Sequence, residues 1–305
     1  MLSVATARSS SIGTLIERDP LLKTMPNVVL AIHLLIERNS PSSFWEAYIN
    51  VLPHAYNTVL YFTPKQLEGL KGSPALEDAL KQYKFVARQY AYFYRLFANT
   101  LLKDYLTYDE YRWAASTVMT RQNIVPHAGG DKTTAGTNEE EGYERLINAL
   151  IPLWDMANHE QGEISTDYEI EAGGASVCLA QRDFAAGEQL TIFYGKRANC
   201  DLLIHNGFVQ PDNPEDCLRL RLGVAKTDAL AAARLALLER VGVVSQKFFL
   251  RRAAAAPLDG KLVAFLRVLQ MDQGTLAEWQ ASEQPAKIMD IEVELVDFYC
   301  FVTSF

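Results

Sequence analysis

Three hydrogen-bonding side chains follow directly on an apolar run in the stretch IPLWDMANHEQGEIS, residues 151–165. The Ile-Pro-Leu-Trp run is followed by Asp155, Asn158 and His159. Such residues can cap backbone groups in a local turn. They can also belong to a ligand pocket, in which apolar walls surround a few convergent polar groups. Taken alone, the stretch favours the turn.

Three further stretches place polar or aromatic side chains at the ends of expected elements. TRQN ends a helical pattern and brings Arg121, Gln122 and Asn123 to a helix end. IFYG ends a strand pattern at Tyr194, and NCDLLIHNGF is typical of a short helix closed by Gly207. Asn123 is also a candidate for an ordinary helix C-cap.

Composition excludes several function classes. The net charge of −8 argues against broad binding to nucleic-acid phosphates. Four scattered cysteines form no C-x-x-C pair, so neither a zinc site nor a disulfide framework is expected, and a reducing compartment fits best. Five histidines lack metal-ligand spacing, so no metal is expected. No apolar run reaches the roughly 18 residues of a membrane helix, and G-x-G-x-x-G, Walker A and G-x-S-x-G patterns are absent.

The elements that must position these side chains follow from periodicity. Apolar spacing predicts helices over residues 27–40, 73–102 (one or two), 111–120, 227–243 and 260–269, the third preceded by a capping-box pattern at TYDE. The aromatic residues of 83–97 are expected to be core. Residues 126–144 are predicted to form a mobile surface loop. Period-two patterning predicts a hairpin with Gly173 and Gly174 at its turn, and then a strand that ends at Tyr194 and Gly195.

The first segment of the chain, MLSVATARSSSIGTLIERDP, is Ser-rich and carries no acidic residue before Glu17. A transit peptide has this composition, but an ordinary first segment of the fold is the favoured interpretation. The order of helices, a strand-rich block and more helices predicts an α+β fold, because the β-α alternation of a doubly wound sheet is lacking.

Taken in order, these motifs resemble the SET-domain protein methyltransferases. The Asn-His pair, followed one hairpin later by Phe-Tyr-Gly, is typical of that family. The resemblance covers nearly the whole chain and is closest to the histidine-specific enzymes that act on actin, in the group of the Rubisco large-subunit lysine methyltransferases. It implies a SET-type β-fold with a helical insertion (residues 1–115), a carboxyl-terminal SET half (116–208) and a partial helical substrate-binding domain (209–305).

The resemblance also implies roles for individual residues. S-adenosylmethionine would be bound by Arg121, Asp155, Met156, Ala157, Asn158, His159, Asn206, Gly207 and Phe208. The acceptor pocket would be walled by Ile151, Trp154, Ile192 and Gln122, although core packing is the alternative for Trp154. Tyr194 would orient the acceptor and shape the methyl passage, unless it is an ordinary strand aromatic.

Asn123 is the residue expected to decide the acceptor. The lysine-specific relatives typically carry an aromatic at this place, whereas an amide can hydrogen-bond one imidazole nitrogen and leave the other nitrogen free to accept a methyl group. A histidine with a pKa near 6.5 is mostly neutral at pH 7, so no strong base is required. The expected activity is therefore histidine methylation, with actin as the expected substrate, in the cytoplasm and also the nucleus.

Two departures from the family pattern lead us to expect a chain truncated at both ends. The family's amino-terminal strands, with a Gly-rich cofactor loop, have no counterpart, and the last residues stop short of the full helical domain. Two alternatives therefore stay open at this point: methylation of a lysine in another protein, and a catalytically silent fragment that retains partner binding.

Overall fold

The computed structural model describes residues 1–127, 145–164, 166–169, 175–180, 182–245, 247–251 and 259–290. The chain forms two compact units, Met1–Pro211 and Asp212–Phe305. Each unit has a hydrophobic core of its own, and the fold is α+β, as expected. The three-part division of the sequence stays a prediction. No described helix is both long and apolar enough to cross a membrane.

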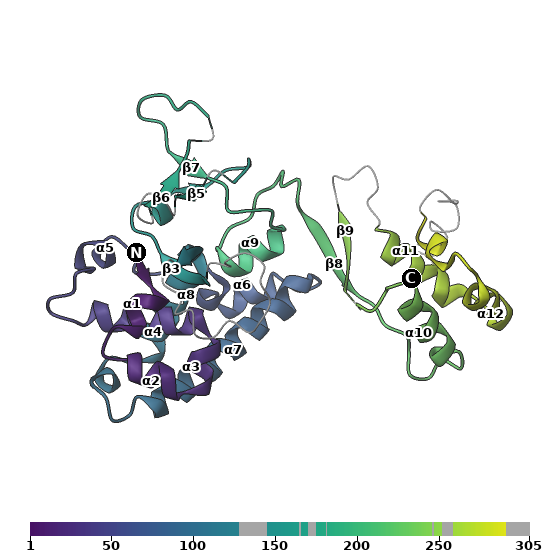
Figure 1. Ribbon diagram of the computed structural model, residues 1–305, viewed down its shortest axis with the longest axis horizontal. Coiled ribbons are helices and arrows are strands. Elements are labelled where there is room, and N and C mark those ends of the chain that lie inside the picture. The colour runs from purple at the N-terminus through teal and green to yellow at the C-terminus, as the bar shows by residue number, and fades with distance from the viewer. Residues whose placement is uncertain are drawn as a thin grey trace, which may run out of the picture. The chain divides into compact units, whose positions relative to one another are not determined.

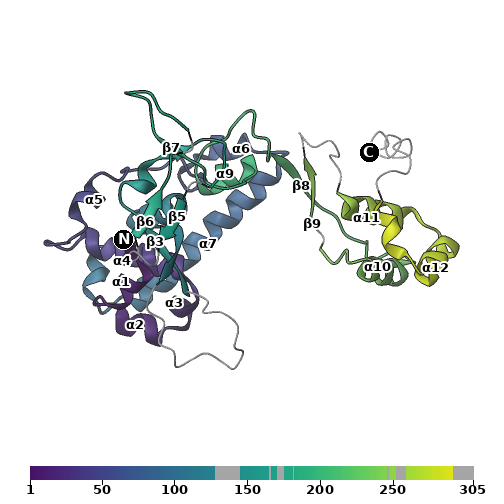
Figure 2. The same ribbon diagram turned by 45° about the horizontal axis from the view of Figure 1, so that its top comes forward.

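Helices build most of unit 1 (Figure 1). They are α1 (Val4–Arg8), α2 (Gly13–Arg18), α3 (Pro20–Thr24), α4 (Pro26–Arg38), α5 (Glu46–Asn50), α6 (Pro64–Glu68), α7 (Pro74–Leu96), α8 (Tyr108–Arg121) and α9 (Asn199–His205). The 3-10 turns are η1 (Val59–Tyr61), η2 (Leu101–Asp104) and η4 (Trp154–Met156). The long helix α7 packs against α8 and α9, as Figures 1 and 2 show.

Local signals set the ends of these helices. Prolines at the first position begin α4 and α7, where a missing N–H costs nothing. The hydroxyl of Thr107 accepts a hydrogen bond from the Glu110 amide at the start of α8. The expectation of one or two helices over residues 73–102 resolves into α7 and then η2.

The expectation that the aromatic residues of α7 form core is only partly confirmed. Phe93 and the adjoining Phe97 are buried, but Phe85, Tyr92 and Tyr94 are exposed. A helix buries one stripe of its surface, so aromatics at so many neighbouring positions cannot all face the core. The first segment of the chain, by contrast, is core: β1 (Leu2–Ser3) and the buried Leu2, Val4 and Ala7 belong to the main apolar cluster of unit 1.

A three-stranded sheet has the order β1-β3-β2, with β2 (Asn123–His127) and β3 (Arg145–Leu150) antiparallel. A second pair, β4 (Asn158–His159) and β7 (Thr191–Ile192), is parallel. The expected hairpin exists as β5 (Thr166–Glu169) and β6 (Ala175–Cys178). Its expected turn at 173–174, residues 128–144 of the loop predicted over 126–144, and the terminal segment 291–305 lie outside the described residues. The loop prediction is wrong at its start, because Pro126 and His127 pair with β3 as part of β2.

The strand of the IFYG motif is shorter than the sequence predicts, because β7 ends at Ile192 and not at Tyr194. The amide of Tyr194 donates to the Nδ1 atom of His159, and Gly195 has a φ of 92°. The chain therefore leaves the ladder after Ile192.

Unit 2 pairs a two-stranded ribbon with helices. Its elements are β8 (Cys217–Arg221), β9 (Lys247–Arg251), α10 (Ala231–Arg240), α11 (Gly260–Gln270), α12 (Gln273–Ala281) and η5 (Pro285–Met289). The core contains Leu237, Phe248, Phe265 and Val268. The helical patterns predicted over residues 227–243 and 260–269 are confirmed in α10 and α11.

Candidate functional site

Asp155 is the centre of a buried polar cluster in unit 1. The Nη1 atom of Arg121, at the end of α8, lies 2.6 Å from the backbone oxygen of Asp155 and 3.5 Å from its Oδ1. The hydroxyl of Tyr48, on α5, donates to the Oδ2 atom of Asp155. The Asp155 side chain is 0% exposed and that of Arg121 is 15% exposed. The structure thus brings Arg121 and Asp155 together and adds Tyr48.

Burial dominates the electrostatics of this cluster. It raises the pKa of Asp155 to about 6, although the hydrogen bond from Tyr48 and the charge of Arg121 both act to lower that pKa. Burial and the Asp155 carboxylate both raise the pKa of Tyr48. The tyrosine therefore stays protonated and acts as a donor at every physiological pH.

A cluster of rings surrounds His159. Its ring lies 5.1 Å from that of Tyr194, in a stacked arrangement, and 6.0 Å from that of Phe208. Because the Nδ1 atom of His159 accepts from the Tyr194 amide, the proton of the neutral ring is on Nε2. Burial lowers the pKa of His159 and so favours this neutral form.

Tyr194 is held by its hydroxyl, which donates to the backbone oxygen of Ala157 over 2.7 Å. Burial raises the pKa of this hydroxyl. The Tyr194 hydroxyl thus donates its proton to the protein backbone. This arrangement fits a role in shaping the site better than a role as a base that takes a proton from a substrate. Asn158, one residue further along the chain, is exposed.

Asn123 opens β2 and does not cap α8, whose C-cap is Gln122. The interpretation of Asn123 as the C-cap is therefore wrong, because the C-cap of α8 lies one residue earlier. Its Nδ2 atom nevertheless donates to the backbone oxygen of Arg121 over 3.1 Å. The Oε1 atom of Gln122 accepts from Asn148 over 2.8 Å. These bonds fix both amides, and within the described chain no donor occupies the Oδ1 atom of Asn123.

The remaining residues of the expected site are placed mainly by packing. Ile151 is buried with Val125 and Ala149, and Trp154 packs against this cluster. Ile192 is buried in β7. The Sδ atom of Met156 lies 3.4 Å from Arg121.

The NGF motif is also positioned by its surroundings. The Oδ1 atom of Asn206 accepts from Arg197 over 3.0 Å. The α-carbon of Gly207 faces the backbone at Asn57, where an added Cβ would meet the carbonyl carbon at 2.7 Å. Close packing therefore explains this glycine independently of any ligand.

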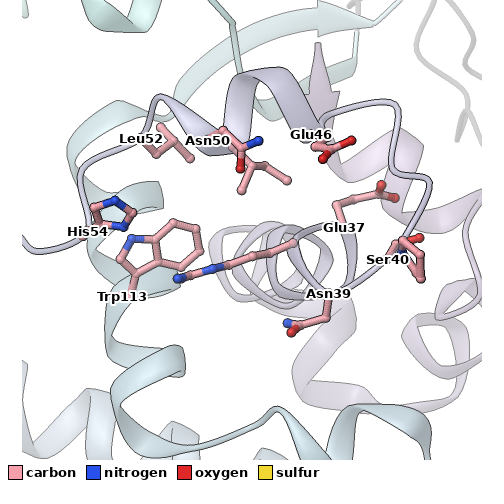
Figure 3. A pocket seen from close by; sticks show the side chains of 11 residues that line it. Glu37, Asn39, Ser40, Glu46, Asn50, Leu52, His54 and Trp113 are labelled. Carbon is pink, nitrogen blue, oxygen red and sulfur yellow. The ribbon is translucent and has the colours of Figure 1, made fainter.

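Sequence reasoning missed two features. Tyr48 carries no local signal, since 107 residues separate it from Asp155. A cavity of about 380 Å³ lies beside α4, α5 and α8 (Figure 3). Its wall includes Arg38, whose guanidinium lies 4.0 Å from the centre of the Trp113 ring. None of the expected site residues lines it. The described residues also contain no group of three or more potential metal ligands.

Known proteins resemble both units. A family model described as Rubisco LSMT substrate-binding matches residues 225–296. Proteins named actin-histidine N-methyltransferase, from Homo sapiens and Gallus gallus, are 43% identical over 284 residues. The alignment covers 91% of this chain and 46% of each relative, so the chain spans less than half the length of the curated relatives that it matches.

Solved structures show the same fold at lower identity. The "Structure of Rubisco LSMT bound to AdoMet" aligns with a TM-score of 0.69 at 21% identity, covering 94% of this chain and 62% of that one. The "Crystal structure of the SET domain of LSMT bound to MeLysine and AdoHcy" aligns with a TM-score of 0.71 at 20% identity, with coverages of 94% and 63%.

Proposed function

Because this chain is a homologue of the actin-histidine N-methyltransferases over nearly all of its length and has a SET-type fold, we propose that it carries the acceptor and cofactor residues of a protein-histidine N-methyltransferase. The substrate would be a histidine of a protein, actin by analogy with the relatives, and the cofactor S-adenosylmethionine. The observation that carries this proposal is the fixed amide of Asn123 beside Arg121. We place the activity in the cytoplasm and the nucleus.

The described residues fit such a cofactor. The Nε atom of Arg121 is buried and has no hydrogen-bond partner within the described chain. Asn158 is exposed in β4, one residue before His159, whose ring lies among those of Tyr194 and Phe208. Polar groups beside aromatic faces can bind a nucleoside that carries an amino-acid end. The cofactor supplies an electrophilic methyl group when it is bound.

The bond from Asn123 to the Arg121 backbone sets the direction in which its amide works. With Nδ2 donating to that oxygen, the Oδ1 atom remains to accept a hydrogen bond. An acceptor imidazole would donate one N–H to Oδ1 and present the lone pair of its other nitrogen. A neutral histidine needs no base before attack, which agrees with the Tyr194 hydroxyl being held at Ala157. Catalysis would come mainly from orientation.

Calorimetry tests the cofactor assignment on the full protein that contains this chain. Asn158→Ala should weaken binding of S-adenosylmethionine by roughly 1–3 kcal/mol, since the bound cofactor loses a hydrogen-bond partner. Asn50→Ala, at an exposed position on α5, is the matched control and should bind normally. Equal affinities for the two variants would remove Asn158 from the site.

Mass spectrometry of methylated actin peptides tests the choice of acceptor. Asn123→Phe should depress methylation of histidine by roughly 10²-fold or more, because discrimination through a buried hydrogen bond is large. The same variant should admit a lysine at the target position. Undiminished histidine turnover in Asn123→Phe would exclude the amide from the mechanism, and wild-type activity on lysine alone would favour the lysine alternative.

A further inference from the structure

We infer that Tyr48 is a positioning residue of this site: its hydroxyl keeps Asp155 in the carboxylate form and thereby holds Arg121 beside the cofactor-binding residues. The inference rests on the proposed function for its catalytic consequence. Its local part, the control of the Asp155 charge, rests on the geometry of the described residues alone.

Side chains from two helices contact the Asp155 carboxylate. Oδ2 accepts from the Tyr48 hydroxyl. Oδ1 is 3.5 Å from Arg121 Nη1, which is a long contact, while the short Arg121 contact of 2.6 Å goes to the backbone oxygen of Asp155. Tyr48 is thus the only side chain of the described part that makes a short hydrogen bond to this carboxylate. Removal of the hydroxyl would take away the side-chain donor of Oδ2 and leave the buried carboxylate with the long Arg121 contact and the backbone of Ile151.

Burial and the neighbouring polar groups act in opposite directions on the charge of the Asp155 carboxylate. The groups that face it are Arg121 from α8, Tyr48 from α5, and more remotely Tyr56 and Tyr194. Burial favours the protonated acid, while Tyr48 and Arg121 oppose burial. The pKa of about 6 is the outcome, so the group is mostly ionised at pH 7. Loss of the Tyr48 hydrogen bond moves that pKa upward, toward or above neutrality.

Arg121 connects the charge of Asp155 to the residues proposed to bind the cofactor. A protonated Asp155 no longer attracts the Arg121 guanidinium by charge, so only the contacts of Nη1 with the Asp155 backbone oxygen and with Met156 remain. The backbone oxygen of Arg121 holds the Asn123 amide, so a shift of Arg121 reaches that residue too. The affinity for the cofactor should therefore fall at low pH, and the pH of this acid limb should match the pKa of Asp155. Without the Tyr48 hydroxyl this limb should lie at higher pH.

The ring and the hydroxyl of Tyr48 have separable roles. The ring is buried in the main core of unit 1, so Tyr48→Ala would open a cavity and destabilise the fold. Tyr48→Phe keeps the ring and removes only the donor. Tyr111→Phe is the matched control, because Tyr111 is also buried and its hydroxyl bonds Gln89 over 3.2 Å.

Two measurements on the full protein test the inference. The first is the dissociation constant of S-adenosylmethionine between pH 6 and 9 by calorimetry. In Tyr48→Phe the acid limb should move up by about one to two pH units, so affinity at pH 7 falls roughly 2- to 10-fold while affinity at pH 9 is retained. Tyr111→Phe should follow the wild type. A uniform loss at every pH, or an unshifted limb, would overturn the positioning role.

The second measurement needs no cofactor. The ¹³C resonance of the Asp155 carboxyl, assigned with Asp155→Asn, should titrate at higher pH in Tyr48→Phe than in the wild type. Identical titrations would overturn the inference. If the wild type does not bind S-adenosylmethionine, the proposed function fails, and this titration still decides whether Tyr48 sets the Asp155 charge. Should Tyr48→Phe not fold, Asp155→Asn must bind the cofactor with a pH-independent affinity, and a retained acid limb would refute the link.

Discussion

Leu153 has a backbone conformation that its residue type disfavours. Its φ of 72° and ψ of −50° are close to those of a strained γ-turn, and no other non-glycine among the described residues has a positive φ. The side chain is 87% exposed, so burial does not compensate for the strain. The sharp turn at this residue lets Trp154 pack on the apolar cluster while Asp155 turns toward Arg121.

Leu153→Gly should raise the free energy of unfolding by about 1 kcal/mol. It relieves a strain of order 1–3 kcal/mol at an entropic cost of about 0.5–1 kcal/mol. Urea unfolding measures the difference. Leu190→Gly, exposed and without a positive φ, carries only the entropic cost and should be less stable than the wild type. If both variants lose stability equally, Leu153 is unstrained.

The sequence reveals the residues of the site only where they are close together along the chain. Arg121, Gln122 and Asn123 form one motif, and Asp155, Asn158 and His159 form another. Tyr48 cannot be found in this way, because its contact with Asp155 depends on how α5 packs. Nor does the sequence show that the Tyr194 hydroxyl is bound by Ala157, since a strand aromatic carries no sign of its hydrogen-bond partner.

At the scale of elements, α9 ends at Gly207. A larger residue there would cost stability twice, once through its backbone conformation and once through a steric clash. Gly207 has a φ of 82°, and its amide donates to the Leu202 oxygen, which is typical of a helix C-terminus. A Cβ at this position would also lie 2.7–2.9 Å from the backbone at Asn57 and Thr58. The glycine thus lets α9 approach the segment before η1.

Gly207→Ala should therefore destabilise the protein by more than the roughly 1–2 kcal/mol of a left-handed alanine alone. Gly195→Ala isolates that conformational part, because Gly195 has a φ of 92° and nothing within 4 Å of an added Cβ. Thermal unfolding of both variants gives the steric part by difference. Equal losses would show that α9 can move away from Asn57.

Helices were predictable where capping residues and periodicity agree, and strands less so. The starts of α7 and α8 carry Ser73 and Thr107, whose hydroxyls cap locally. The strand β7 depends instead on a partner from before the β5–β6 hairpin, since Asn158 pairs with Thr191. Its end is fixed by the bond between the Tyr194 amide and His159, which no local pattern indicates.

At the scale of the whole molecule, Asp155 couples stability to pH. Its pKa is about 6 in the folded state and 3.8 in the reference state. Between these values the folded state binds more protons, so the contribution of this group to stability is lost as pH rises from about 4 to 6. This residue of the candidate site is thus ionised at neutral pH, and its ionisation lowers the stability of the fold.

The free energies of unfolding of Asp155→Asn and the wild type should therefore diverge with pH. The variant should gain on the wild type by about 2 kcal/mol as pH rises from 4 to 7. Denaturant titrations at four pH values measure this difference, and groups common to both proteins cancel. A difference that is independent of pH would mean that Asp155 titrates alike in the folded and unfolded states.

The pairing of β1 with β3 has a consequence for synthesis on the ribosome. Leu2 pairs with Leu150, and both are fully buried in the main core of unit 1. At ribosomal rates of about 5–20 residues per second, roughly 7 to 30 s separate the synthesis of these two partners. During that interval the nascent helices α1 to α8 can form, but the strand that completes their core does not yet exist. The nascent chain leaves Leu2 and its apolar neighbours without their partner strand for that time, and such exposed apolar surface favours association with other chains.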